Sequence, residues 1–244
     1  MININKNTSI KKLERLLTKN IIGHNKENSS IVKLFNKRYF LEQIIEETID
    51  FNKKLNWKKT SHNLHLVKSA EELIEVFQLR SDIYTNIGYN FEFPDVIEGL
   101  NFDTYDKKSA ILFYKNNSTI TGSIRFIFDS HMRLPTEKKV SLNSIRQSYN
   151  NIGELSRLIV KKEENALNLE FKYLMQGVYH ILMNNNIDVT LLAIKKSHYK
   201  LYEKFGGTSI IKDMDDYGKL GQEMYLISLD PSHASKFFKR TFLR

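Results

Sequence analysis

The stretch NIGELSRLIV, residues 151–160, has the pattern of a buried strand, yet it carries two charged side chains. Burying a charge costs free energy unless the charge is paired or hydrogen-bonded, so Glu154 and Arg157 need partners. Side chains alternate along a strand, which places Glu154 with Ser156 on one face and Arg157 with Leu155 on the other. We therefore expect either a β-bulge that realigns the two charges or a separate partner for each.

The composition is that of a globular protein. The chain has 244 residues, of which 41% are hydrophobic, enough for one large domain or a domain with an extension. Cysteine is absent, which excludes disulfides, a thiol nucleophile and zinc sites built on thiolates. The 7 histidines show no ligand spacing with nearby carboxylates, and no phosphate-binding loop or dinucleotide fingerprint occurs. We expect no metal and no permanently bound cofactor.

The formal net charge of +9 favours acidic partners. Basic residues occur in scattered pairs and no nucleic-acid-binding motif stands out, so we expect no nucleic acid as a partner. No apolar run reaches the length of a membrane span, and the N-terminus lacks a secretory signal, which predicts a cytoplasmic protein. The basic aromatic tail KFFKRTFLR, residues 236–244, leaves open a transient membrane contact.

The first quarter of the chain has a helical pattern. Apolar residues recur at helical spacing over residues 8–56 and are interrupted by the polar turn GHNKENSS, residues 23–30. The polar stretch NWKKTSHN, residues 56–63, then connects to a region of different character. The sequence predicts an N-terminal helical extension over residues 1–60 and a second domain over residues 61–244.

Strands and helices alternate in the second domain. A strand at 64–68 precedes a helix that Ser69 and Glu72 open as a capping box. After a long aromatic loop at 88–106, two strands form a hairpin that turns at Asn116 and Asn117. The remaining elements are a short helix at 141–149, the charged strand, a long amphipathic helix, the strand DVTLLAI, a helix bounded by Ser197 and Gly206, and two closing strands. This order predicts a mixed sheet with helices on its faces, an α/β (α+β) fold.

Several short motifs occur in an order that resembles a known family. They are an arginine followed by two aromatics, an acidic pair, a G-S-x-R strand, an E-x-S-R strand and the segment HYKLYEKFGG: Arg80, Tyr84 and Phe91; Asp103 and Asp106; Gly122, Ser123 and Arg125; Glu154, Ser156 and Arg157; and residues 198–207. The last segment resembles the final conserved helix of GCN5-related N-acyltransferases (GNAT). The ordered set is similar to long-chain N-acyl amino acid synthases and acyl-homoserine lactone synthases, over residues 64–228.

The resemblance implies a GNAT-like, mostly antiparallel sheet flanked by helices, and acyl transfer from a thioester to an amine. Autoinducer synthases usually carry tryptophan where Phe91 stands, and the loop that follows is longer here, which favours the N-acyl amino acid branch. The turn VKKEENALNLEFK, residues 160–172, lacks the glycines that close on a coenzyme A pyrophosphate. We therefore expect acyl-phosphopantetheine on an acyl carrier protein as the donor, with acyl-coenzyme A as the alternative, and a small-molecule amine as the acceptor.

The implied chemistry assigns roles to the strand and the last helix. Glu154 would take the proton of the amine, since burial can raise the pKa of a carboxyl group toward the range suited to proton transfer. Backbone amides near Arg157 and Leu158 would stabilise the oxyanion if a bulge turns them outward. Tyr202 would protonate the departing thiolate, with Tyr199 on the same helix face as its rival.

The remaining polar and aromatic residues are expected to bind substrate. Arg80 or Arg125 would hold the carboxylate of an amino-acid acceptor, and the acidic pair would orient these arginines or the amine. The set expected in this role is Arg80, Tyr84, Phe91, Asp103, Asp106, Arg125 and Ser156. A purely structural network that tethers the long loop fits the same residues, and core packing fits both tyrosines of the last helix, so these alternatives stay open.

A long acyl chain needs an apolar pocket. The candidates for its lining are Phe126, Phe128, Leu174, Met175, Val178 and Leu191. Three other functions stay open: an acyl-homoserine lactone synthase that uses S-adenosylmethionine, a coenzyme A-dependent acetyltransferase, and a non-catalytic module that binds lipid or a carrier protein.

Overall fold

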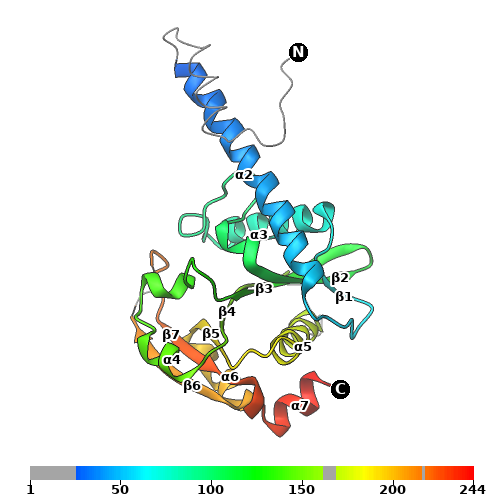
Figure 1. The fold of residues 1–244 in the computed structure, drawn as a ribbon, viewed down its shortest axis with the longest axis vertical. Coiled ribbons are helices and arrows are strands. Elements are labelled where there is room, and N and C mark those ends of the chain that lie inside the picture. Colours follow the sequence, from blue (N-terminus) through cyan, green and yellow to red (C-terminus); the bar gives the residue numbers. More distant parts are fainter. Residues whose placement is uncertain (1–25, 162–168, 216–217) are drawn as a thin grey trace. The chain divides into compact units, whose positions relative to one another are not determined.

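The computed structural model describes residues 26–161, 169–215 and 218–244 (Figure 1). The chain divides into two compact units, Met1–Ile44 and Ile45–Arg244. The candidate site residues all lie in the second unit, which is described below.

Helix α2, Lys26–Lys54, begins inside the stretch predicted to be a turn. The prediction is wrong from Lys26 onward, because residues 26–30 contain neither glycine nor proline and nothing there breaks a helix. The helical pattern expected before this stretch lies outside the described residues.

One seven-stranded sheet organises the second unit. Its elements are β1, Leu64–Leu66; α3, Ala70–Asn86; η1, Thr104–Lys108; β2, Ser109–Asn116; β3, Thr119–Phe128; η2, Pro135–Lys138; α4, Asn143–Ser148; β4, Ile152–Val160; α5, Leu169–Asn184; β5, Val189–Lys195; η3, Lys196–His198; α6, Tyr199–Phe205; β6, Thr208–Met214; β7, Met224–Leu229; η4, Pro231–His233; and α7, Lys236–Phe242. The strand order is β1-β2-β3-β4-β5-β7-β6. Neighbours are antiparallel except for β4 and β5, which are parallel, and this confirms the mixed, mostly antiparallel sheet.

Strand β4 contains the β-bulge that the buried charges suggested. The pairing with β3 shifts after Ser156, so that Arg157 and Leu158 together lie opposite Ile124. Arg157 adopts a positive φ of 54°. Its guanidinium thereby reaches the same face as Arg125, which strict alternation along the strand would not allow.

The parallel ladder between β4 and β5 is short. It runs from the pair Ile152 and Val189 to the pair Glu154 and Leu191 and then ends, and the two halves of the sheet separate from there (Figure 1). Leu155 and Ser156 then pair with β3 alone, and the two bulge residues after them, 157 and 158, have no register partner on either neighbouring strand. An interruption of the sheet therefore lies immediately after Glu154.

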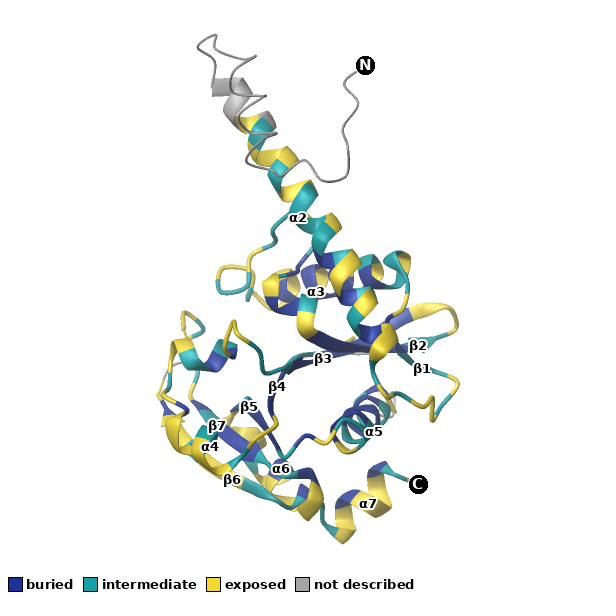
Figure 2. Ribbon diagram, viewed as in Figure 1, coloured by how far each residue is buried: buried dark blue, intermediate teal, exposed yellow. Residues whose placement is uncertain are grey.

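Two of the apolar clusters of the core lie on opposite faces of the sheet. The first lies against α5 and contains Leu155 and Leu192, and the second contains Ile127 and Leu191. Figure 1 shows α3 on one side of β3 and α5 on the other. Strand β3 is buried along most of its length (Figure 2).

The end of α2 anchors the sheet at β2. The Asn52 side chain donates from Nδ2 to the carbonyl oxygen of Ser109 at 2.9 Å and accepts at Oδ1 from the amide of Ile111 at 3.2 Å. The ring of Phe51 meets that of Phe128 edge to face at 5.2 Å. This part of α2, which the sequence analysis counted in the extension, thus packs within the second unit.

The helix ends agree with the sequence at two places and differ at one. The capping box of α3 is confirmed, with Ser69 and Glu72 exchanging side-chain-to-backbone hydrogen bonds. Gly206 ends α6 at a φ of 81°. The expected N-cap, Ser197, is wrong: it lies within η3, which runs directly into α6, so His198 is the preceding residue. No described helix is both long and apolar enough to cross a membrane.

The hairpin turn lies one residue later than expected. Asn117 and Ser118 have the positive φ angles, and Asn116 is the last residue of β2. The register between β2 and β3 shifts between Tyr114 and Lys115, so that Asn116 pairs with Thr119 and two residues are left for the turn.

Candidate functional site

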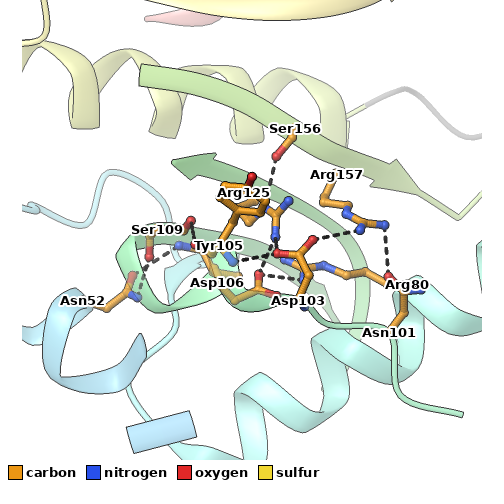
Figure 3. Close-up of polar contacts among 11 residues, drawn as sticks. Asn52, Arg80, Asn101, Asp103, Tyr105, Asp106, Ser109, Arg125, Ser156 and Arg157 are labelled. Carbon is orange, nitrogen blue, oxygen red and sulfur yellow. Dashed lines mark hydrogen bonds and ion pairs between the residues drawn. The ribbon is translucent and has the colours of Figure 1, made fainter. Parts of the chain in front are cut away.

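Arg125 stands at the centre of a buried polar network (Figure 3). Its Nε donates to Ser156 Oγ at 3.0 Å, across the β3–β4 pair. Its Nη1 lies 2.7 Å from Asp103 Oδ1 and 3.1 Å from Asp106 Oδ1. The guanidinium is 3% exposed, so these ion pairs are screened little by water.

Asp103 and Asp106 are fixed by the turn that carries them. They form a reciprocal capping box at η1: Asp103 Oδ1 accepts from the amide of Tyr105, and Asp106 Oδ2 accepts from the amide of Asp103. Asp106 also binds Arg80 Nη1 at 2.9 Å, and neither side chain of that pair is exposed. Burial acts to raise the pKa of Asp103, but Arg125 and Arg157 outweigh it and hold that pKa well below its usual range.

Arg157 connects the bulge to the long loop. Its Nη1 donates to Asn101 Oδ1 and its Nη2 to Asp103 Oδ2, both at 3.0 Å. The guanidinium lies over the rings of Tyr84 and Phe93, at 5.2 and 4.6 Å from their centroids. The left-handed backbone at this residue is strained, and the partners on three elements hold it in place.

The long loop is itself tethered to α3. Asp95 accepts from the hydroxyl of Ser81 at 2.6 Å, and Asn101 donates to the carbonyl oxygen of Phe93 at 2.7 Å. The loop thereby holds the Phe93 ring over Arg157. Phe91, which the sequence analysis placed at the site, is instead 50% exposed.

Glu154 has a different environment. Its carboxylate is 3% exposed and accepts from the amide of Thr136 in η2 at 2.9 Å. No ion pair of Glu154 occurs among the described residues. Burial raises the pKa of this carboxyl group above its ordinary value. Thr136 gave no signal in the sequence, because a backbone donor can come from any residue.

The two tyrosines of α6 lie in the apolar cluster against α5. Tyr202 is buried next to Phe205, and burial raises the pKa of its phenol to about 12. Tyr199 is partly buried and meets Tyr225 edge to face at 5.4 Å. The structure thus separates these rings from Glu154 by the thickness of the sheet, except where β4 and β5 part.

A narrow apolar cavity of about 20 Å³ lies on the α5 face. Its lining comes from β4, α5, β5, α6, β7 and α7: Leu155, Met175, Val178, Tyr179, Leu182, Thr190, Leu192, Phe205, Gly206, Leu229, Ala234 and Phe238. Of the expected pocket residues, Met175 and Val178 line it. Phe126 and Leu174 lie deeper in the same cluster, and Phe128 packs against that cluster.

Leu191 does not reach this cavity. Strand alternation places it in the cluster on the other face, and the next residue, Leu192, lines the cavity instead. Within the described residues no group of three or more histidine, aspartate or glutamate side chains is arranged to hold a metal ion.

The structure therefore gathers most of the expected binding residues but not all. Arg80, Asp103, Asp106, Arg125, Ser156 and Arg157 form one network, and Tyr84 joins it through its ring. Sequence reasoning missed Asn101 and Phe93. Both lie in the aromatic loop that its length and composition had marked as functional.

Comparisons with known proteins agree with this arrangement. The sequence model of the family N-acyl amino acid synthase FeeM matches residues 75–230, more than half of the chain. The structure of FeeM, from uncultured soil microbes, matches with a TM-score of 0.56 at 15% identity and covers 74% of this chain and 94% of its own. No curated protein matches the sequence.

Two acyl-homoserine lactone synthases have a similar fold. BjaI, a coenzyme A-dependent enzyme, matches with a TM-score of 0.57 at 14% identity, over 75% of this chain and 88% of its own. LasI matches with a TM-score of 0.55 at 13% identity, over 73% and 95%. At such identities these likenesses show the fold alone, which is the expected GNAT-like one. The family match includes every residue of the network, and the chain therefore belongs to the N-acyl amino acid synthase FeeM family and is an acyltransferase.

Proposed function

We propose that the protein transfers a long-chain acyl group from a thioester to the amine of an amino acid or similar small molecule. The observation that carries this proposal is the place of Glu154. A buried carboxyl group with a raised pKa lies on the last residue of β4 that pairs with β5, three residues before the bulge. Such a group contributes little to stability, but it is suited to accept a proton.

The reaction would take place where the two strands separate. The acceptor amine attacks the thioester carbonyl while Glu154, directly or through water, removes its proton. The unpaired strand positions Arg157 and Leu158 would supply amide donors to the oxyanion. Tyr202 would return a proton to the thiolate, because a phenol with a pKa of about 12 is protonated at neutral pH. Tyr199, which is less buried, is the alternative donor.

The acceptor would bind on the network side. Arg80 and Arg125 are paired with the acidic residues, and because their side chains are 0% and 3% exposed they are out of reach of a substrate carboxylate. Asp103 is 29% exposed on its side chain and Arg157 is 10% exposed. We assign the acceptor's ammonium to Asp103 and its carboxylate to Arg157, with Arg80 and Arg125 as positioning residues.

The donor would come on an acyl carrier protein. Residues 160–172 lack the glycines expected at a coenzyme A pyrophosphate. Glu170, in the first turn of α5, is 7% exposed and accepts from the Thr121 hydroxyl at 3.2 Å. A carboxylate at this position offsets the favourable field that a helix N-terminus offers a phosphate. Because BjaI is a coenzyme A-dependent enzyme, acyl-coenzyme A has to be tested beside acyl carrier protein as the donor.

The test is thiol release from long-chain acyl carrier protein in the presence of pooled amino acids, with mass spectrometry of the product. Glu154→Gln should slow release at least about a hundredfold, because general-base catalysis contributes about 10²–10⁴. Glu75→Gln, at a carboxylate that is 46% exposed, is the matched control and should leave the rate unchanged.

Parallel reactions with acyl-coenzyme A and with S-adenosylmethionine separate the alternatives for donor and acceptor. No release with any pair of substrates would refute the proposal. Full activity in Glu154→Gln would refute the assigned base and leave the reaction standing.

A further inference from the structure

The apolar cavity has one wall that is not part of the central fold. Strands β4, β5 and β7 and helix α5 form most of its lining, and they are held by the ladder of the sheet and by the core. The remaining lining comes from Phe205 and Gly206 at the end of α6 and from the segment after β7, which contributes Ala234 and Phe238. With about 20 Å³ of free space, the cavity has room for little more than one small group. A long acyl chain therefore needs a wall that can move.

Among the described residues, the hydrogen bonds that join the beginning of α7 to the rest of the fold go to the end of α6. Ser235 donates its amide to the carbonyl oxygen of Phe205 at 2.7 Å and its hydroxyl to that of Lys204 at 2.6 Å. Gly206 allows this close approach, because a Cβ there would lie 2.6 Å from the carbonyl oxygen of His233. The start of α7 is therefore held by hydrogen bonds, whereas its last turn is held by ring contacts of the buried Phe242 with Phe171 and Phe205.

Phe238 is the side chain through which α7 closes the cavity. It is 4% exposed, and its ring packs within 5.5 Å, between centroids, of Tyr179, Phe205 and Phe242. These contacts are ring against ring, without a hydrogen bond from the side chain, so the helix can shift by exchanging one apolar contact for another. The adjacent Phe237 is 42% exposed and does not line the cavity.

We propose that α7 is the end wall of the acyl-chain site and that Phe238 sets the length of the acyl chain the enzyme accepts. The occupant is the methyl end of the acyl chain, because the lining offers apolar side chains almost throughout. This inference rests on the proposed function, since it assigns a specificity-determining residue to the same reaction.

The experiment compares the full-length wild type with Phe238→Ala, Phe238→Leu and the control Phe237→Ala. Each is assayed with saturated acyl donors from eight to eighteen carbons. Phe238→Ala should move the preferred donor about two carbons longer, with about a fourfold gain in relative kcat/KM for each methylene newly buried. Phe238→Leu should give a smaller shift in the same direction and protects the test against a folding defect of the alanine variant. Phe237→Ala should keep the wild-type profile.

A second readout does not depend on transfer. Calorimetric binding of free dodecanoate and hexadecanoate should show a higher ratio of affinities for the longer acid in both Phe238 variants than in the wild type. An unchanged donor profile in an active Phe238 variant would overturn the inference and leave the proposed function intact. If the wild type transfers no acyl group, the proposed function fails and the fatty-acid ratio decides: an unchanged ratio, or no binding by any of the proteins, overturns the inference.

Discussion

Asp106 and Glu154 are both buried carboxylates on the α3 face of the sheet, and their surroundings are opposite. Asp106 has no exposed side-chain surface and lies 2.9 Å from Arg80 and 3.1 Å from Arg125. Glu154 is 3% exposed and accepts from a backbone amide, and it has no ion pair among the residues that the structure describes. One carboxylate is saturated by cations, whereas the other is left beside a break in the sheet.

This difference suggests different roles, positioning for Asp106 and proton transfer for Glu154. A carboxylate between two guanidiniums is engaged in charge-assisted hydrogen bonds and holds three chain segments together. A carboxyl group whose pKa burial has raised exchanges protons more readily near neutral pH. The same face of the sheet therefore carries the buried polar network around Arg125, which we call the frame, and beside it one reactive group, Glu154.

The largest expected effect is on the frame. Asp106→Ala leaves Arg80 wholly buried without its ion-pair partner, and Arg80 Nε and Nη2 already have no hydrogen-bond partner within the described part of the chain. Breaking a buried pair on one side costs about 3–5 kcal/mol. Urea unfolding should show this loss in the free energy of unfolding. A loss below about 1 kcal/mol, as for an exposed ion pair, would contradict the burial of the Arg80–Asp106 pair.

The next effect tests how the frame connects to β4. Ser156→Ala removes the oxygen that accepts from Arg125 Nε and should cost about 1–3 kcal/mol in the free energy of unfolding, because a buried donor is left unpaired. Ser156→Thr, which keeps the hydroxyl, is the control for the loss of the oxygen alone. Equal losses in the two variants would show that packing, not the hydrogen bond, is at stake.

Sequence reasoning recovered the frame because its residues are charged and stand in strand and helix patterns. Arg80, Asp103, Arg125 and Arg157 could be singled out from residue type, burial and order, and the structure joins them. The bulge was one of two alternatives that the burial of Glu154 and Arg157 left open. Its place on the strand is set by the register with β3, which no local pattern encodes.

The remaining parts of the site depend on contacts that leave no mark in the sequence. The aromatic ring over Arg157 belongs to Phe93, not to Phe91, because the loop's tethers at Asp95 and Asn101 decide which ring turns inward. The cavity takes Leu192 and not Leu191 for the same reason of register. Helix α7 was treated as a surface tail, since its amphipathic pattern does not say which cavity it covers.

Substitution of Glu154 should change the free energy of unfolding in the opposite direction to substitution of Asp106 or Ser156. Its folded-state pKa lies above the unfolded value of about 4.3, so its contribution to stability is present below that pH and is lost as the pH rises through the folded pKa. Glu154→Gln keeps an oxygen for the Thr136 amide and should raise the free energy of unfolding at pH 7 relative to wild type, with the gain shrinking toward pH 4. Urea unfolding at both pH values measures it. A variant that is destabilised at pH 7 would place Glu154 within the structural frame.

The smallest expected effect comes from an ion pair outside the buried frame. Lys107 lies in the same 3-10 turn as Asp106 and contacts Glu47 at 2.8 Å, but the Glu47 side chain is 46% exposed. Lys107→Ala should therefore cost no more than about 1 kcal/mol in urea unfolding, because water screens the pair and competes for both groups. Raising the salt concentration should shrink this loss further, while the loss in Asp106→Ala should persist. If Lys107→Ala cost as much as Asp106→Ala, burial would not be what distinguishes the Lys107–Glu47 pair from the Arg80–Asp106 pair. The total charge of the turn would then determine its stability.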